Sequence, residues 1–220
     1  MAPIIPMGIE AKHLLLLLNW MSPAFPTGAF AYSHGLEWTI EAGDVRSADD
    51  LTTWITDLVT RGSGWNDAVL FARCWHDDPA ALNDLALALC SSRERYIEST
   101  QLGRSFAIAA GVFAPQGNED GDIAYPISAG RALASLQVNK EDALLAFLQG
   151  FCAALTSVAV RLVPLGQTQG LVVLRDLMPA ISATAERASV ATLDDLGSIT
   201  LGADIAAMKH ESLHSRVFRT

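Results

Sequence analysis

The stretch that follows Asn139 constrains the fold more than any other part of the chain. Asn139 and the two acidic residues after Lys140 are typical of a helix start, because their side chains accept hydrogen bonds from the first free amides. Pro164 marks the end of the helix, since proline cannot continue one. Between these signals, apolar side chains keep to one broad helical stripe: Leu144, Phe147, Leu148, Phe151, Leu155, Val158, Ala159 and Leu162. The sequence therefore predicts a long amphipathic helix here.

Helix signals recur along most of the remaining chain. Ser47 begins one helix with a pattern close to a capping box, and Asp78 followed by Pro79 begins another. Ser91 or Ser92 begins a third, which we expect to run to about residue 113. Further helices are predicted at 11–20, which we expect to be almost wholly buried, at 33–42, 65–75 and 126–138, and at 169–190, as one helix or as two divided at Pro179.

The fold class follows from these helices and from the absence of strand patterns. No convincing alternation of apolar and polar residues with period two, the mark of a half-buried strand, occurs in the sequence. A chain of 220 residues fits one domain. The predicted fold is all-α, a single-domain bundle of about eight to ten helices that covers residues 1–220. The first residues, about 1–10, contain two prolines and are expected to be loose.

Composition limits the classes of partner and the location. The net charge of −9 argues against duplex nucleic acid, and the balance of 50% hydrophobic to 18% charged residues favours a well-packed domain with apolar surface left for partners. No membrane attachment is expected, because the apolar run at 14–18 is too short to span a bilayer. Cys74, Cys90 and Cys152 lack the spacing of metal ligands and lie in apolar helical contexts, which predicts reduced core residues and a cytoplasmic protein.

Residues 22–38 form a segment whose first half cannot be ordinary helix. Pro23 and Pro26 restrict the backbone there, and Gly28 and Gly35 follow. The segment is nevertheless rich in large apolar groups: Phe25, Phe30, Tyr32, Leu36 and Trp38. A stiff loop of this composition must dock, either in the core of its own chain or on a partner.

Three blocks of the sequence resemble the UreF family of urease accessory proteins. Residues 22–37 read Ser-Pro-x-x-Pro-x-Gly-x-Phe-x-Tyr-Ser-x-Gly-Leu-Glu, which is similar to the signature of that family. Residues 163–167, Val-Pro-Leu-Gly-Gln, resemble a second family segment, and residues 204–220 resemble its C-terminal tail. The blocks stand in the family's order and together span most of the chain.

The resemblance implies a fold, a function and a set of partners. UreF proteins are all-helical dimers that bind a second accessory protein, UreD (also called UreH), and recruit the GTPase UreG. The assembly helps to deliver nickel to the urease apoprotein, and its proposed tasks include control of GTP hydrolysis. The resemblance therefore implies a maturation chaperone that is not itself an enzyme and has no cofactor.

The resemblance also assigns partner-binding residues. Tyr32 and Arg216 would belong to the face that recruits the GTPase. The residues that match the tail held by the second accessory protein are His210, Glu211, Ser215 and Phe218. Glu37 lies beside Tyr32 in the signature, and the sequence leaves two roles open for it, a contact on a docking face or a cap at the start of a short helix. The tail departs from the family at Lys209, where arginine is common, and at 213–214.

The tail itself, about 203–220, has few large apolar residues. A helix this short is marginal in water, so we expect the tail to be loose in the free protein and to fold on the second accessory protein. Deletion of residues 205–220 should then spare the fold and abolish complex formation.

Two alternative functions compete with the accessory role. His210-Glu211-x-x-His214 fits the zinc metallopeptidase pattern, in which two histidines share a helix face and the glutamate acts as base. Only six residues follow His214, which leaves no room for the usual third ligand. The second alternative is a generic helical scaffold protein. His34 stands without a neighbouring ligand and is expected to be a surface histidine or one satisfied by hydrogen bonds.

Overall fold

The computed structural model describes residues 9–114 and 121–220, and in these ranges the protein is a bundle of ten α-helices and two short 3₁₀ helices. In chain order they are α1 (Ala11–Trp20), η1 (Ala29–Ala31), α2 (Leu36–Ala42), α3 (Ala48–Arg61), α4 (Ser63–Arg73), α5 (Pro79–Ala88), α6 (Arg93–Ala110), α7 (Tyr125–Ser135), α8 (Lys140–Leu162), α9 (Gln167–Val190), η2 (Leu193–Asp195) and α10 (Leu201–His210). The described ranges contain no strand, which confirms the all-α prediction. The expected looseness of about residues 1–10 concerns a segment of which 1–8 lie outside the described residues.

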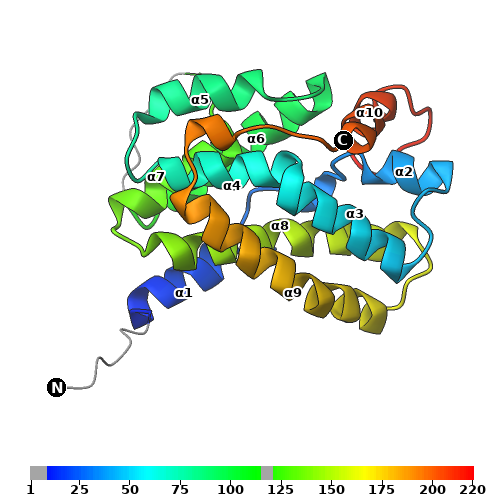
Figure 1. Ribbon diagram of the computed structural model, residues 1–220, viewed down its shortest axis with the longest axis horizontal. Helices are drawn as coiled ribbons and strands as arrows, with labels where there is room; N and C mark the ends of the chain where they lie inside the picture. Colours follow the sequence, from blue (N-terminus) through cyan, green and yellow to red (C-terminus); the bar gives the residue numbers. More distant parts are fainter. Residues whose placement is uncertain (1–8, 115–120) are drawn as a thin grey trace.

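Helix α8 is the core of the bundle. It crosses the middle of the molecule in Figure 1, with α9 packed along it and with α1, α2, α3, α4 and η1 also in contact. Its length and apolar composition would also suit a membrane-spanning helix, but its apolar face is buried by the surrounding helices. The buried residues of α8 are Ala143, Leu144, Phe147, Leu148, Cys152, Leu155, Thr156, Val158 and Ala159. The predicted stripe is therefore the face that the rest of the bundle covers.

The predicted capping residues begin the helices as expected. Ser47 and Asp50 form a reciprocal capping box at α3, and the side chains of Asp78, Ser92 and Asn139 accept amide hydrogen bonds at the starts of α5, α6 and α8. These bonds satisfy amides that have no partner within the helix.

Helix α9 runs through Pro179 without a break, so the first of the two alternatives for 169–190 is correct. Proline removes one helical hydrogen bond, which leaves the carbonyl of Arg175 without its amide partner. Both residues are exposed, so water can satisfy that carbonyl.

Helix α1 has the predicted bounds but not the predicted burial. Leu14, Leu15 and Leu18 are 41%, 68% and 63% exposed, and only Leu17 and Trp20 are buried. The expectation of an almost wholly buried helix was wrong because α1 packs on α8 along one side only. An uninterrupted run of leucines cannot show from the sequence which side that is.

The C-terminal segment is ordered in the isolated chain, which corrects the expectation of a loose tail. Helix α10 packs on α2 and α6, and residues 211–220 return along the loop that follows α1 (Figure 1). The amide of Ser33 donates to the carbonyl of Thr220 at 2.7 Å, and that of Arg219 donates to Ala31 at 2.8 Å. The prediction of a loose tail was based on its small number of large apolar residues. It was wrong because backbone hydrogen bonds and buried carboxylates hold the segment.

Gly35 permits the close packing of α10 on α2. Its φ is +78°, a conformation that glycine adopts without steric cost. A Cβ atom at this position would lie 2.7 Å from the backbone nitrogen of Ala207. The buried face of α10 is correspondingly small: Ala203, Ala206, Ala207 and His210. Glycine on one helix and alanines on the other thus bring the two backbones together.

Candidate functional site

The signature loop, residues 22–35, is built into the molecule by its aromatic residues. Phe25 is buried, with its ring centroid 6.2 Å from that of Trp20 in α1 and 5.4 Å from that of Phe106 in α6. Phe30 is the exception and stays 71% exposed. Gly28 at φ +80° starts the 3₁₀ turn at 29–31, and His34 and Gly35 have positive φ where the loop enters α2. The loop is thus docked in its own chain, with one aromatic side chain exposed.

Glu37 at the start of α2 anchors the C-terminal segment. Its carboxylate accepts hydrogen bonds from the amides of Val217 at 2.7 Å and Phe218 at 2.9 Å. It also lies 3.1 Å from Nε2 of His210. Charge-assisted hydrogen bonds of this kind are the strong ones in proteins. Of the two roles left open for Glu37, the structure shows neither a contact on an exposed face nor a helix cap, but a buried acceptor for the tail.

His210 lies between two carboxylates. Its ring is fully buried, with Nε2 facing Glu37 and Nδ1 2.7 Å from Oε2 of Glu94 in α6. Glu94 also accepts a hydrogen bond from Nη1 of Arg216 at 2.6 Å. The tail is therefore held on one side by α2 and on the other by α6.

The next acidic residue along α6 holds the end of the tail. Glu98 accepts a hydrogen bond from the hydroxyl of Thr220 at 2.7 Å and one from Nη1 of Arg95 at 2.6 Å, and it lies 3.4 Å from Nδ1 of His34. Burial alone would raise the pKa of Glu98, but the charge of Arg95 and the contacts with His34 lower it overall. Burial lowers the pKa of His34, whose Nε2 lies 2.6 Å from the hydroxyl of Ser63. This confirms His34 as a histidine satisfied by hydrogen bonds.

The predicted partner-binding residues fall into a buried and an exposed group. Tyr32, Glu37, His210 and Phe218 are buried, and Glu211, Ser215 and Arg216 are exposed. Tyr32 donates its hydroxyl hydrogen to Gln101, and burial raises its pKa. The hypothesis that Tyr32 is an exposed docking residue is therefore wrong, because its side chain is packed between the loop and α6.

Exposed members of the set also contribute to the local structure. Glu211 accepts hydrogen bonds from the amides of Arg93 at 3.0 Å and Glu94 at 3.4 Å, at the N-terminus of α6. A negative charge is favourable at that end of a helix.

The two remaining residues of the set differ in their contacts. The buried Phe218 is covered by the guanidinium of Arg161, which lies 4.5 Å from the ring centroid. Ser215 has no hydrogen-bond partner within the described residues and is free to contact a partner protein.

The zinc-binding geometry suggested by His210 and His214 does not form. Helix α10 ends at His210, so His214 is not placed one helical turn beyond it. His210 is buried between its two carboxylates while His214 is exposed. Across residues 9–114 and 121–220, no group of three or more histidine, cysteine, aspartate or glutamate side chains is arranged to hold a metal ion. The peptidase alternative lacks the arrangement that its motif requires.

Sequence reasoning missed the acidic residues of α6. Glu94 and Glu98 occupy the same helical stripe as Leu102 and Phe106, at intervals of four residues, and all four are buried. Charged residues that continue an apolar stripe are a signal of buried, paired carboxylates. With that signal, α6 would have been recognised as the surface on which the tail docks.

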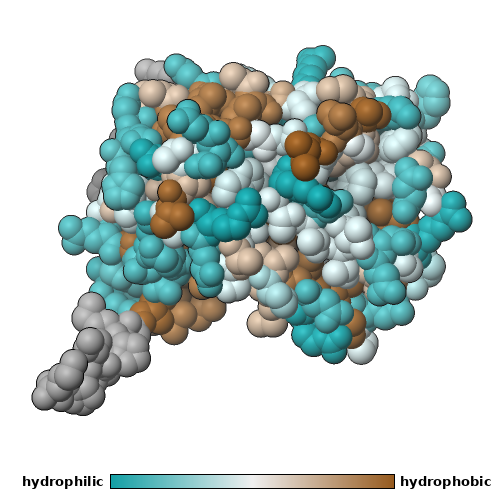
Figure 2. Space-filling model, viewed as in Figure 1, coloured by the Kyte–Doolittle hydropathy of each residue, from teal (hydrophilic) through white to brown (hydrophobic). Residues whose placement is uncertain are grey.

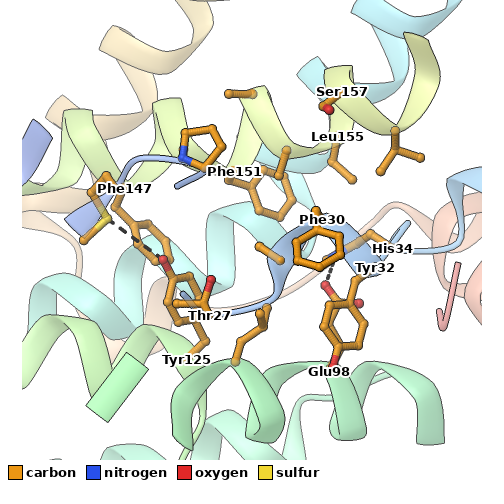
Figure 3. A pocket seen from close by; sticks show the side chains of 18 of the residues that line it. Thr27, Phe30, Tyr32, His34, Glu98, Tyr125, Phe147, Phe151, Leu155 and Ser157 are labelled. Carbon is orange, nitrogen blue, oxygen red and sulfur yellow. Dashed lines mark hydrogen bonds and ion pairs between the residues drawn. The ribbon is translucent and has the colours of Figure 1, made fainter. Parts of the chain in front are cut away.

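A cavity of about 120 Å³ lies beside these residues, and we call it the loop cavity. Figure 3 shows it between α8, which contributes Phe147, Phe151 and Leu155, the signature loop with Phe30 and Tyr32, and α6 with Glu98. Asp67 of α4 and Arg95 of α6 also line it. Burial raises the pKa of Asp67 to about 6, although the nearby charge of Arg95 opposes that shift. Asp67 was not among the residues predicted from the sequence to form a site.

The outer face of α10 is apolar and exposed. Leu201, Ile205 and Met208 follow one another at helical spacing, and Ile199 precedes them; all four are exposed. Figure 2 shows hydrophobic side chains gathered over α10 and the segment that leads into it. Lys209 lies at the edge of this face, with its Nζ 4.4 Å from the ring centroid of Trp38. We call Ile199, Leu201, Ile205 and Met208 the α10 stripe.

Comparisons with known proteins agree with the resemblance found in the sequence. The family model named UreF matches residues 45–178. A urease accessory protein UreF from Methylorubrum populi is 43% identical over 221 residues, which cover 94% of this chain and 98% of the relative. The urease accessory protein UreF of Cereibacter sphaeroides is 46% identical over 208 residues with the same coverage, and that of Brucella ovis is 43% identical over 214 residues, 94% of each chain. The chain therefore belongs to the UreF family of urease accessory proteins.

Proposed function

We propose that this protein acts in urease maturation as a binding protein without catalytic activity of its own. It holds the accessory protein UreD (UreH) through the C-terminal region and recruits the GTPase UreG, so that nickel reaches the urease apoprotein in the cytoplasm. The observation that carries the proposal is an exposed apolar stripe on α10, next to an ordered tail, in a chain of the UreF family. The relatives named above are accessory proteins rather than enzymes.

The α10 stripe has the character of a partner interface. Its apolar side chains form the centre of a patch whose rim is polar, with Asp204 and Lys209 on α10 and Glu211 beyond it. Protein interfaces combine an apolar centre with a polar rim in this way. Exposed apolar groups gathered on one helix are costly to leave in water, which favours an occupied state. We assign this face to the second accessory protein.

The buried residues of the predicted site act by positioning the exposed ones. Glu37 and Glu94 fix the backbone and side chains around Arg216, and Arg216 keeps part of its guanidinium exposed while bonded to Glu94. Arginine in such a held position loses little further freedom when it meets a carboxylate of a partner. We therefore assign Glu211, Ser215 and Arg216 to direct contact, and Tyr32, Glu37, His210 and Phe218 to support.

A second apolar surface supports the proposed homodimer. The exposed leucines of α1 lie near the end of α6, because the rings of Trp20 and Phe113 are 5.8 Å apart. Exposed apolar residues there are Leu15, Leu18, Ile108, Val112 and Phe113. A second copy of this chain is the occupant we propose, since stable homodimer interfaces are large and apolar, burying about 2,000 Å² or more. Light scattering of the isolated protein tests the dimer.

The α10 stripe is tested by charge substitution. In the double variant Ile205→Glu and Met208→Glu, both changed side chains are exposed, so the fold should be kept while an apolar interface would have to bury two charges. We expect loss of co-purification with UreD (UreH) and loss of urease activation in a reconstituted maturation assay. The variant Leu171→Glu, on the exposed face of α9, is the matched control and should behave as the unchanged protein.

Retained co-purification in the double variant, with circular dichroism and melting unchanged, would remove the α10 stripe from the partner interface. Equal loss in the α9 control would show that added negative charge, and not the position, is responsible. Either result would overturn the assignment of this face.

A further inference from the structure

Six phenylalanine, tyrosine and tryptophan side chains are among the residues that line the loop cavity. Tyr125 of α7, with Phe147 and Phe151 of α8, forms its walls together with Trp20, and Figure 3 shows these labelled α7 and α8 rings around the space. The faces of aromatic rings carry negative potential and attract cations at close range. Within the described residues, the one hydrogen bond of the Tyr125 hydroxyl is a long one that it donates to the sulfur of Met21, at 4.0 Å, so its oxygen can accept a hydrogen bond from a ligand.

Asp67, Arg95 and Glu98 form what we call the charged floor of the cavity, where two carboxylates lie beside one guanidinium. Glu98 is matched by Arg95, with Nη1 and Oε1 2.6 Å apart. Asp67 lies 3.9 Å from the same guanidinium and accepts no hydrogen bond from any described residue. Its side chain keeps 22% of its surface exposed. A charged carboxylate that is largely buried and accepts no hydrogen bond is unfavourable unless a cation neutralises its charge.

The remaining basic groups do not supply that cation. Arg161, which also lines the cavity, donates to the carbonyl of Phe30 at 3.0 Å and lies over Phe218. His34 is bonded on both nitrogens, to Glu98 and Ser63, and burial lowers its pKa, so it is neutral at pH 7. The floor therefore keeps a net negative charge, and an anion would find Arg95 already occupied.

The size of the cavity limits what can enter it. A cavity of roughly 150 Å³ takes up benzene, which has six non-hydrogen atoms. The loop cavity is slightly smaller, at about 120 Å³, and the exposed Phe30 is one of its lining residues. A ligand of about five non-hydrogen atoms, apolar along its stem and charged at one end, would match both the walls and the floor.

We propose that the loop cavity binds a small organic cation, an ammonium or guanidinium group on a short alkyl stem, with Asp67 as its counter-charge. The stem lies against Phe147 and Phe151, and the charged head reaches Asp67. The hydroxyl oxygen of Tyr125 accepts a further hydrogen bond from the head group.

The test is a titration of the isolated full-length protein at pH 7.5 and constant ionic strength. The probe is n-butylammonium chloride, followed by amide and indole chemical shifts in ¹H–¹⁵N spectra, with 1-butanol as the neutral isostere and butyrate as the anion. We expect saturable shifts at residues lining the cavity, at millimolar amine, and binding about tenfold weaker or more for both comparison compounds. Equal binding of 1-butanol, or preferred binding of butyrate, would overturn the cation assignment.

Two variants locate the site. Asp67→Asn removes the charge and keeps the shape, and Ala154→Leu fills the cavity from α8 and keeps every charge. Both should lose the n-butylammonium shifts, while Asp176→Asn, an exposed acid on α9, should keep them. Asp67 also lines a second cavity of about 110 Å³ on its other side. Binding that survives Ala154→Leu would place the amine outside the loop cavity and overturn the proposal.

A free amine and a lysine or arginine side chain of a partner protein carry the same chemistry. Adding saturating n-butylammonium to the complexes with UreD (UreH) or UreG separates the two sources, and this arm rests on the function proposed above. Release of a partner identifies an inserted side chain, whereas an undisturbed complex identifies a free amine. The titration of the isolated chain does not depend on these partners, so failure of the proposed function would leave its result intact.

Discussion

The carboxylate of Asp67 should lower the stability of the folded protein at neutral pH. Its pKa is about 6 in the folded state, against 3.8 for the ordinary group, chiefly because burial disfavours the charged form. A difference of this size corresponds to about 3 kcal/mol of free energy. Since 22% of the side chain is exposed and water screens part of its charge, we take about 1–2 kcal/mol as the penalty.

The pH dependence has a definite sign. Well below pH 3.8, the ordinary pKa of the group, Asp67 is protonated in both the folded and the unfolded chain, and no penalty exists. As pH rises through 3.8 to above 6, the unfolded chain releases its proton first, so stability falls by the full amount. Asp67→Asn removes this fall. At pH 7.5 the variant should therefore be more stable than the unchanged protein by the full penalty, and near pH 4.5 by only about a third of it.

The assay is urea unfolding followed by circular dichroism at both pH values. At pH 7.5 we expect Asp67→Asn to gain about 1–2 kcal/mol, or roughly 2–8 °C in melting temperature for a chain of this size. Asp50→Asn is the matched control with the opposite sign, because Asp50 accepts amide hydrogen bonds from Arg46 and Ser47 that lower its pKa. A variant that is less stable at pH 7.5, or changed equally at both pH values, would refute the reasoning.

Two further predictions concern the tail and the dimer. Glu37→Gln should speed amide hydrogen exchange at Val217 and Phe218 by about tenfold or more, because the charged acceptor of both amides is lost. Glu41→Gln, on the exposed side of α2, should leave that exchange unchanged, and uniform acceleration along the chain would mean that Glu37 supports the whole fold and not the tail. Leu18→Lys should convert the proposed dimer to a monomer in light scattering at micromolar concentration with no loss of helicity, and an unchanged dimer mass would exclude the α1 surface as the interface.

The helices could be predicted from the sequence because their signals are local. Ser47, Asp78 and Asn139 cap the helices at which they were expected, and the stripe of α8 is the face that the bundle buries. The signals of amphipathic periodicity and capping depend only on neighbours within one turn or two of helix. The resemblance to UreF, based on three short blocks, was confirmed over most of the chain.

The candidate site could be predicted only in part because its contacts join distant segments. Glu37 is separated from Val217 by 180 positions, and Glu94 from Arg216 by 122. The resemblance pointed to residues of the loop and the tail, but it could not show that these two segments bind each other. Tyr32 was taken as exposed for the same reason, since its partner Gln101 lies on a helix far along the chain.

One face of α6 contributes to both features that were not predicted from the sequence, the ordered tail and the charged cavity. Glu94 and Glu98 continue the apolar stripe of α6 into a region that the tail covers. The Glu94 end fixes His210 and Arg216, and the Glu98 end fixes Thr220 and forms the floor of the loop cavity through Arg95. Burying two carboxylates is costly unless each is fully bonded, and here every one of these bonds comes from the tail, His34 or Arg95. Glu94 and Glu98, together with Glu37 of α2, thus hold the C-terminal segment, and Glu98 with Asp67 leaves the floor of the loop cavity negative beside Arg95.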